Sequence, residues 1–311
     1  MSGPAAAALG STLLASGITV LGLVVAAVWG VSDFLGGLAA RRATPLLVVT
    51  IAHILSSVLL VLLALGFHAH EPSGRTLVWA VMTGVTGGGA VILFYRALAL
   101  GEMGSSAALA GVLTAAVPVV FSWLSEGRPK LSQLLGFAIA LAAITLIAYE
   151  PGTRVRPRGL GLAAIAGCGF GAFLVASKFA SQGAVLWPLA YSRLTSAALA
   201  AGLLGVAHLR GRRAEFAGQG SGPPGLSAPG EAKQMAPLWL LAGSAGILEA
   251  AGNLLYMVAT LRGRLDVAAV LSSLYPAGPI LLGAWLLRET ATRIKALGIA
   301  LALVAVAVIS L

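Results

Sequence analysis

The sequence predicts an all-α membrane protein of ten transmembrane helices, arranged as two inverted five-helix repeats. Three observations lead to this prediction. The composition is 59% hydrophobic and only 10% charged, whereas soluble domains usually carry about 25% charged residues. Apolar runs long enough to cross a bilayer recur along the whole chain, and parts of the second half match the first.

Apolar runs of about 20 residues are the length that a helix needs to cross a bilayer. The first run lacks a basic region before it, is too long for the core of a signal peptide and precedes nine others, so we expect a true first span. Residues 210–236 are rich in Gly, Pro and Ser and predict a flexible loop. The ten predicted spans are 14–39, 45–67, 76–98, 103–125, 131–149, 159–181, 187–208, 237–260, 266–287 and 294–311.

The basic residues are typical of the loops of a membrane protein. Twenty Lys and Arg against ten Asp and Glu give a net charge of +10, but they are scattered between apolar runs and no nucleic-acid-binding motif occurs, so we expect no nucleic acid as a partner. The single cysteine, Cys168, lies in an apolar run, which excludes a disulfide framework and a Cys-based metal site and predicts a small buried thiol.

A repeat appears when the sequence is shifted by 162 residues. Leu109 then falls on Leu271 and Trp123 on Trp285, within spans four and nine. Five spans are an odd number, so a second copy must enter the membrane from the opposite side. The predicted repeats are 14–149 and 159–311, and inverted repeats of this kind suit alternating access with a site near the midplane.

Two segments, 95–148 and 255–310, resemble the repeat of the drug/metabolite transporter superfamily in its EamA-type ten-span branch. In the second half Ser273, Pro276, Glu289 and Gly298 occupy the places of the Ser-x-x-Pro element, the Arg-Glu turn and the final Gly-bearing helix. The first half departs from this pattern, with threonine in place of the proline and glycine in place of the glutamate, while "VWG" at 28–30 resembles the Trp-Gly element of the family's first span.

The resemblance implies a ten-helix carrier of small organic solutes whose central cavity lies between the halves. It also implies that both termini lie in the cytoplasm, as members of the family are generally drawn. The Lys and Arg of the loops favour the opposite orientation, with thirteen after odd-numbered spans and six after even-numbered ones. Inverted halves dilute this charge bias, so we follow the family.

Ionisable residues inside the spans are candidates for function because a charge in the bilayer is costly. Glu249 lies near the middle of span eight, and Asn253 and Tyr256 follow on the same part of the helix surface. This stripe either binds a cation, a substrate amine or a proton, or provides hydrogen bonds between helices. Asp33, deep in span one, is either a proton- or substrate-binding carboxylate or a structural partner of a buried arginine such as Arg193 or Arg96.

The remaining polar residues of the spans carry weaker predictions. Arg96 either extends to the membrane interface or binds an anionic group of the substrate, whereas Arg193 is expected in a structural ion pair. Lys178 is expected to reach the interface, and His53 to be a satisfied polar residue between helices. Three residues before Pro276 either line a pocket or bond back to a kinked helix: Ser272, Ser273 and Tyr275.

The inverted repeat and the polar residues of the spans predict a secondary active transporter of the cell membrane, and the resemblance implies that it exports small organic metabolites or drug-like solutes. The expected partners are the lipid bilayer, the solute and H⁺, with no cofactor and no metal; a homodimer is left open. The alternative is an integral membrane enzyme acting on a lipid-like substrate. Such an enzyme needs clustered acids or a nucleophile with its base, but the ten acids are scattered, and no nucleotide-binding loop is present.

Overall fold

The computed structural model describes residues 4–40, 43–100, 103–147, 157–209, 238–275, 277–286 and 292–309, and within these ranges every regular element is an α-helix. The predicted all-α class is therefore confirmed. The helices are α1 (Pro4–Ala40), α2 (Pro45–Gly66), α3 (Gly74–Leu100), α4 (Met103–Glu126), α5 (Leu131–Ile147), α6 (Pro157–Ala180), α7 (Leu186–Leu209), α9 (Leu238–Arg262), α10 (Leu265–Ser272), α11 (Ala277–Leu286) and α12 (Arg293–Ile309).

Seven of these helices are long and apolar enough to cross a membrane: α1, α2, α3, α4, α6, α7 and α9. Helices α5 and α12 are apolar but have 17 residues each. The run at 266–287, predicted as one span, is instead divided into α10 and α11. Helix α10 ends before Pro276, which itself lies outside the described residues. A proline lacks a backbone N–H and clashes with the preceding turn, so helices tend to stop before one.

Local sequence signals explain where α2 begins. Pro45 stands at its first position, where a missing N–H removes no helical hydrogen bond. Thr44 is the N-cap, and its hydroxyl oxygen accepts a hydrogen bond from the Leu47 N–H at 3.4 Å. The cap supplies an acceptor that the first turn of a helix otherwise lacks.

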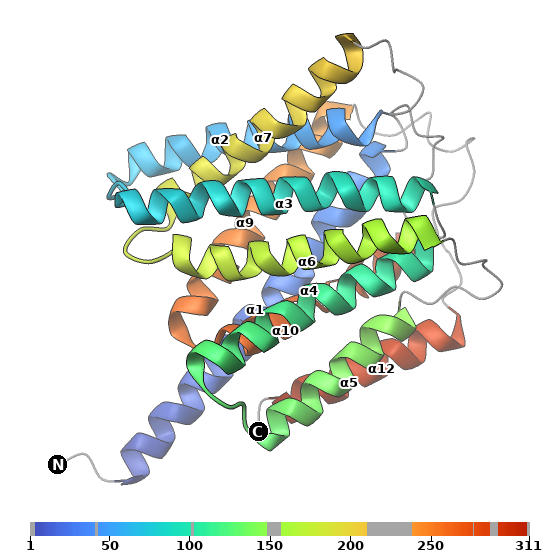
Figure 1. Cartoon of the computed structure of the whole chain (residues 1–311). Helices are drawn as coiled ribbons and strands as arrows, with labels where there is room; N and C mark the ends of the chain where they lie inside the picture. Colours follow the sequence, from blue (N-terminus) through green and yellow to red (C-terminus); the bar gives the residue numbers. More distant parts are fainter. Residues whose placement is uncertain are drawn as a thin grey trace.

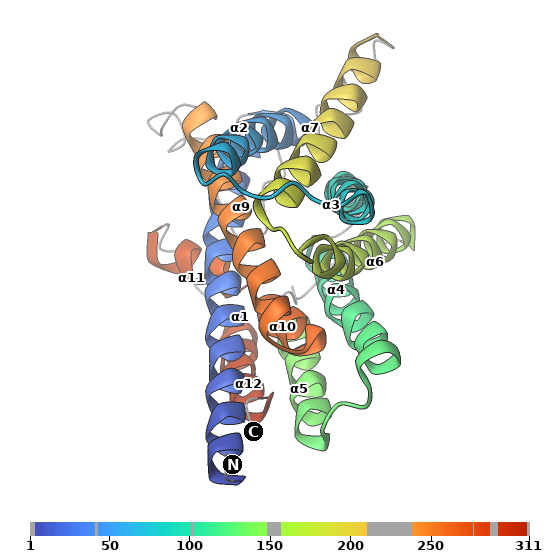
Figure 2. The ribbon, with the colours of Figure 1, turned by 90° about the vertical axis from the view of Figure 1, so that its left-hand side faces the viewer.

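The two halves of the chain are interleaved in space. Figures 1 and 2 show α5 alongside α12 and α1 alongside α9, and α3 likewise packs along α6. Helix α2 packs against α7 and α9, and α4 against α6 and α10. Most of the extensive helix contacts thus join a helix of residues 14–149 to one of residues 159–311, and the halves do not form separate globular bodies.

The outer surface is apolar and the interior holds polar side chains, the reverse of a soluble domain. Leu62 is 61% exposed and Leu124 84% exposed, whereas His53 and Arg193 are each only 3% exposed. An apolar exterior of this kind suits lipid. Cys168 also lies on the exposed surface of α6, so the expectation of a buried thiol is wrong. A small apolar thiol is compatible with either environment, which is why the sequence did not distinguish them.

Glycine allows the closest approach between α2 and α9. A Cβ added at Gly246 of α9 would lie 2.6 Å from the carbonyl carbon of Ala52 and 2.7 Å from its Cα. Backbone atoms cannot turn away as a side chain does, so the two helices would have to separate. This contact holds together the helices that carry His53 and Glu249.

Gly246→Ala is expected to destabilise the fold by about 1–3 kcal/mol, the usual cost of overpacking. The matched control is Gly36→Ala on α1, where a Cβ would lie 3.8 Å from the Ala245 Cβ, an ordinary contact. Thermal unfolding of the purified protein in detergent measures both. A Gly246→Ala variant as stable as Gly36→Ala would show that the α2–α9 approach is not tight.

Candidate functional site

A cluster of charged and polar side chains lies in the interior where α2, α7 and α9 meet. Glu249 is near the middle of α9, and His53 and Arg193 are seven to eight residues inside α2 and α7. Arg193 Nη1 donates to Glu249 Oε1 at 2.8 Å, and His53 Nε2 lies 3.1 Å from Glu249 Oε2. The three helices therefore bring one acid and two basic groups together well inside the bundle.

The His53 ring has a polar neighbour at each nitrogen. Nδ1 lies 2.8 Å from the Ser196 Oγ, while Nε2 lies between Glu249 Oε2 and Arg193 Nη1, the latter at 2.9 Å. With a proton on Nε2 the ring donates to Glu249 and accepts from Ser196; with the proton on Nδ1 it donates to Ser196 and accepts from Arg193. A doubly protonated ring donates to both acceptor oxygens. Each neutral tautomer of His53 thus finds partners among the surrounding side chains.

Three buried nitrogen atoms in two side chains beside Glu249 lack an acceptor within the described part of the chain. Nε and Nη2 of Arg193 and Nδ2 of Asn253 are buried and have no hydrogen-bond partner among the described residues. Buried N–H groups without an acceptor are costly. Arg193 is therefore held chiefly through Nη1, and its charge is offset by Glu249.

Helix α1 brings its side chains against α9 next to this cluster. Trp29 Nε1–H donates to Asn253 Oδ1 at 3.0 Å, and Ser32 Oγ–H donates to the Ala245 carbonyl at 2.8 Å. Gly252 leaves the space that the indole occupies, since a Cβ there would lie 2.5 Å from the Trp29 Nε1. These contacts fix the rotation of α1 about its axis relative to α9.

Asp33 follows Ser32 and has no hydrogen bond or ion pair with any described residue. Its side chain is exposed, and its carboxylate is close enough to Glu249 for the two charges to repel each other. One of the two arginines considered for Asp33, Arg193, is instead paired with Glu249, and the side chain of the other, Arg96, lies outside the described residues. Among the described side chains, Asp33 is thus the carboxylate of this region without a cationic partner.

Aromatic rings surround Trp29 on the far side of Asn253. The Trp29 and Tyr256 ring centroids are 5.8 Å apart, and those of Trp29 and Tyr275 are 6.3 Å apart in an edge-to-face arrangement. Tyr256 is 1% exposed, and its hydroxyl donates to the Leu174 carbonyl of α6 at 3.3 Å. Helices α1, α6, α9 and the end of α10 therefore meet at these rings.

The remaining residues predicted for the site lie differently. Ser272 donates to the Ala268 carbonyl at 2.6 Å and Ser273 to the Ala269 carbonyl at 2.7 Å, so both hydroxyls bond back to their own helix, the second of the two alternatives considered. Both serines are buried. Arg96 is named among the candidates, but its side chain lies outside the described residues.

Sequence reasoning found the candidate acids but not their partners. Each of His53 and Arg193 stood out as a polar residue in an apolar run, yet nothing in the sequence says which ones meet. Trp29 was noted only for its place in a family-like element, and its hydrogen bond to Asn253 follows from the packing of α1 on α9. Only the interhelical geometry distinguishes Glu249 from Asp33 as the partner of Arg193.

Comparisons with known proteins agree with this architecture. Residues 16–149, which run from α1 to α5, match the model of the EamA-like transporter family. Seventeen chains of solved structures match the fold. One, titled "Crystal structure of protein", has a TM-score of 0.73 and 18% identity, over 94% of this chain and 96% of its own; at that identity the likeness shows the fold alone. No curated protein matches the sequence. The protein is thus a multi-pass membrane protein whose residues 16–149 match the EamA-like transporter family.

Proposed function

We propose that this protein is a secondary active transporter of the cell membrane that exports small organic solutes by alternating access, coupled to the proton gradient. The observation that carries the proposal is the polar cluster of Glu249, Arg193 and His53, placed in the interior of an apolar helix bundle with Asp33 beside it. Ionisable residues at such a depth are costly and are retained where ions or substrates pass. No observation specifically favours the alternative of a membrane enzyme.

The pattern of helix contacts supports ten spans in two inverted repeats. If α1 to α5 correspond to α6, α7, α9, α10 with α11, and α12, then the α1–α9 contact corresponds to α3–α6, and α2–α9 to α3–α7. The contact of α4 with α6 corresponds to those of α10 and α11 with α1, while α2–α7, α4–α10 and α5–α12 correspond to themselves. A two-fold relation between the halves requires such a set of paired contacts.

Asp33 and Glu249 are the groups that we assign to proton or substrate binding. Two carboxylates near each other repel, and a proton or a cation bound by one of them removes the repulsion. Arg193 offsets Glu249, which leaves Asp33 to take up a proton or the amine of a substrate. Asn253, Tyr256 and Tyr275 lie around Trp29 and are assigned to the solute. Asn253 and Tyr256 are buried, so they reach a solute only after a change of structure.

The other candidates need a change of structure to take part. The hydroxyls of Ser272 and Ser273 would have to leave their own helix to meet a solute, and such a change is plausible only if α10 moves between states. Arg96 remains a prediction from sequence. Alternating access provides the movement, since α10 lies at the contact between the proposed halves.

Transport by purified protein in liposomes tests the proposal. A panel of amino acids and amphipathic amines is offered with and without a pH gradient, and we expect at least one class to move faster when the gradient is present. Empty liposomes and a protonophore that collapses the gradient are the controls. Movement that is insensitive to the gradient would remove the proton from the mechanism, and a panel in which nothing moves would contradict transport of these classes.

A further inference from the structure

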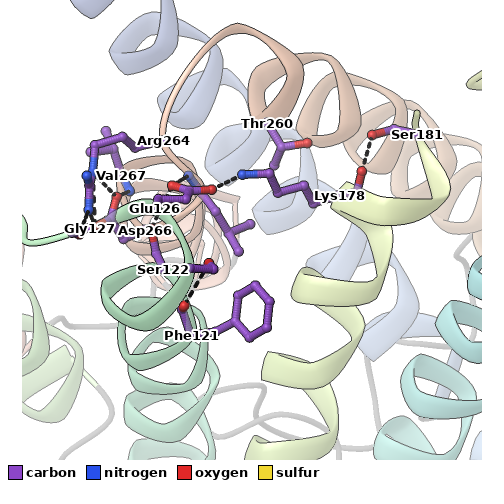
Figure 3. A network of polar contacts seen from close by, with 12 residues as sticks. Phe121, Ser122, Glu126, Gly127, Lys178, Ser181, Thr260, Arg264, Asp266 and Val267 are labelled. Atoms are coloured by element: carbon purple, nitrogen blue, oxygen red, sulfur yellow. Dashed lines mark hydrogen bonds and ion pairs between the residues drawn. The ribbon is translucent and has the colours of Figure 1, made fainter. Parts of the chain in front are cut away.

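A second polar network ties together the ends of α4 and α6 and the start of α10 (Figure 3). Glu126, the last residue of α4, forms an ion pair with Lys178 in the last turn of α6. Its other oxygen, Oε2, accepts from the Ser122 hydroxyl at 2.7 Å and from the Leu265 N–H at 3.1 Å. Lys178 was expected to extend to the interface, but it is bound to an acid instead because α6 ends next to α4.

The Leu265 N–H is one of the backbone donors that the first turn of a helix leaves unsatisfied. Arg264, the N-cap of α10, makes no capping hydrogen bond with its side chain. Glu126 therefore supplies from another helix the acceptor that a local cap would provide. Asp266, which is fully buried, satisfies a second donor of the same turn by accepting from the Val267 N–H at 2.8 Å.

A second ion pair, between Arg264 and Asp266 at the start of α10, orients an arginine that also hydrogen-bonds to the end of α4. Arg264 Nη2 donates to Asp266 Oδ2 at 2.8 Å and also to the Gly127 carbonyl at 3.0 Å. Gly127 directly follows Glu126 and has φ +92°, a conformation that favours glycine. Two adjacent residues at the end of α4 thus hold the start of α10, one through its side chain and one through its backbone.

Helix α10 connects this network to the centre of the bundle. Its Leu271 side chain lies where α1 has Gly22, so that a Cβ on that glycine would be 2.8 Å from the Leu271 Cβ. Just beyond its end, Tyr275 meets Trp29 edge to face. A displacement of the start of α10 would therefore move the aromatic rings beside Asn253.

An ion pair suits a contact between helices, here the ends of α4 and α6, that must break and form again. The side chains of Lys178 and Glu126 are 22% and 18% exposed, so each loses much of its hydration on pairing. The desolvation cost of an ion pair offsets most of its attraction, and water restores the hydration when the pair separates. An apolar contact has no such compensation, because opening it exposes apolar surface to water.

We propose that Glu126 is the latch of this side of the protein: its carboxylate holds α6 through Lys178 and α10 through the Leu265 N–H, and it must release both before the centre opens to the side where α4 and α6 end. The inference rests on the proposed alternating access. It assigns a function to Glu126 that the carboxylates of the central cluster do not share, namely control of access to them.

Reactivity of a buried thiol tests the latch without any substrate. Cys168 is first replaced by serine, and Thr260→Cys is introduced as the reporter, because Thr260 is 4% exposed and lies in the last turn of α9, in the region drawn in Figure 3. The modification rate by a water-soluble, membrane-impermeant thiol reagent present on both sides of proteoliposomes is compared in four backgrounds: the parent, Glu126→Gln, Lys178→Met and Glu71→Gln. Glu71 is exposed, lies in the segment joining α2 and α3 and serves as the matched control.

We expect Glu126→Gln and Lys178→Met each to raise the modification rate by about tenfold, in the range of typical coupling between states, and Glu71→Gln to leave it unchanged. Rates within about twofold of the parent for both network variants would overturn the latch, as would an equal increase for Glu71→Gln. Size-exclusion profiles check folding, and Lys178→Met serves if Glu126→Gln misfolds, since it keeps the bonds of Glu126 to Ser122 and Leu265. Because the assay needs no transported solute, its failure is distinct from failure of the transport experiment.

Discussion

Glu249→Gln is expected to reduce gradient-driven transport by about a hundredfold, because it leaves Arg193 without a counter-charge in the interior region where Asp33 is assigned the proton. Glutamine keeps the size of the side chain and one oxygen that accepts from Arg193 Nη1. It removes the negative charge, and Arg193, which is 3% exposed, then remains in the interior without a counter-charge. His53 also loses the carboxylate that lies 3.1 Å from its Nε2.

The same change is expected to lower the free energy of unfolding by about 2 kcal/mol, less than the loss for a fully buried pair. We expect a smaller loss of stability than for a fully buried pair because the Glu249 side chain is 33% exposed, so part of its hydration survives in the folded protein. Transport in liposomes and thermal unfolding in detergent measure the two effects separately.

A double variant separates the structural part of this loss from the functional part. Arg193→Leu with Glu249→Leu removes both charges, and such apolar replacements of buried pairs are often neutral or stabilising. We expect it to regain the stability lost in Glu249→Gln but not the transport. If Glu249→Gln keeps wild-type coupling, or if the double variant transports normally, the cluster serves only to join α2, α7 and α9.

Asp33→Asn is expected to leave stability within about 0.5 kcal/mol of the parent, as for most exposed substitutions, while transport loses its dependence on the pH gradient. The side chain is exposed and has no hydrogen bond or ion pair with the described residues, so little of the fold depends on its charge. The amide has the same shape but cannot take up a proton. Initial rates measured over a series of imposed gradients give the dependence directly.

Ser32→Ala, at the neighbouring residue, is the control, because we expect it to change stability and not gradient dependence, the reverse of Asp33→Asn. It removes the hydrogen bond to the Ala245 carbonyl and is expected to lower stability by about 1 kcal/mol, with the gradient dependence retained. Asp33→Asn with unaltered gradient dependence would contradict our assignment of the proton to Asp33. Loss of dependence in Ser32→Ala as well would indicate that the packing of α1 on α9, rather than the carboxylate, is responsible.

The class of the fold was available from the sequence because lipid imposes a strong local rule. Every backbone group in the bilayer must be hydrogen-bonded within the segment, so a long apolar run is a helix. Seven predicted spans correspond to helices long and apolar enough to cross, and the prolines near 276 were recognised as a disturbance. That the disturbance divides the run into α10 and α11 depends on how the two pieces pack.

The polar sites depend on contacts between different helices, and rules based on spacing along one helix do not predict these. Spacing along one helix placed Glu249 and Asn253 on a common face, since residues four apart are neighbours on a helix. No such rule relates residues on different helices. Lys178 was therefore assigned to the interface, and Arg193 was connected with Asp33 rather than with Glu249. Glu126, which joins α4 to α6 and α10, was not among the candidate residues.

The sequence by itself determined the helical membrane class, the positions of the apolar runs and the rare ionisable residues within them, because each follows from the chemistry of a single segment in lipid. Tertiary structure alone decided that Arg193 pairs with Glu249 rather than Asp33, and that Glu126 joins α4 to α6 and α10. Those choices depend on which helices touch and at what rotation. Close contacts of glycine help to set that rotation, and in two of them, Gly246 with Ala52 and Gly252 with Trp29, the partners lie more than a hundred residues apart along the chain.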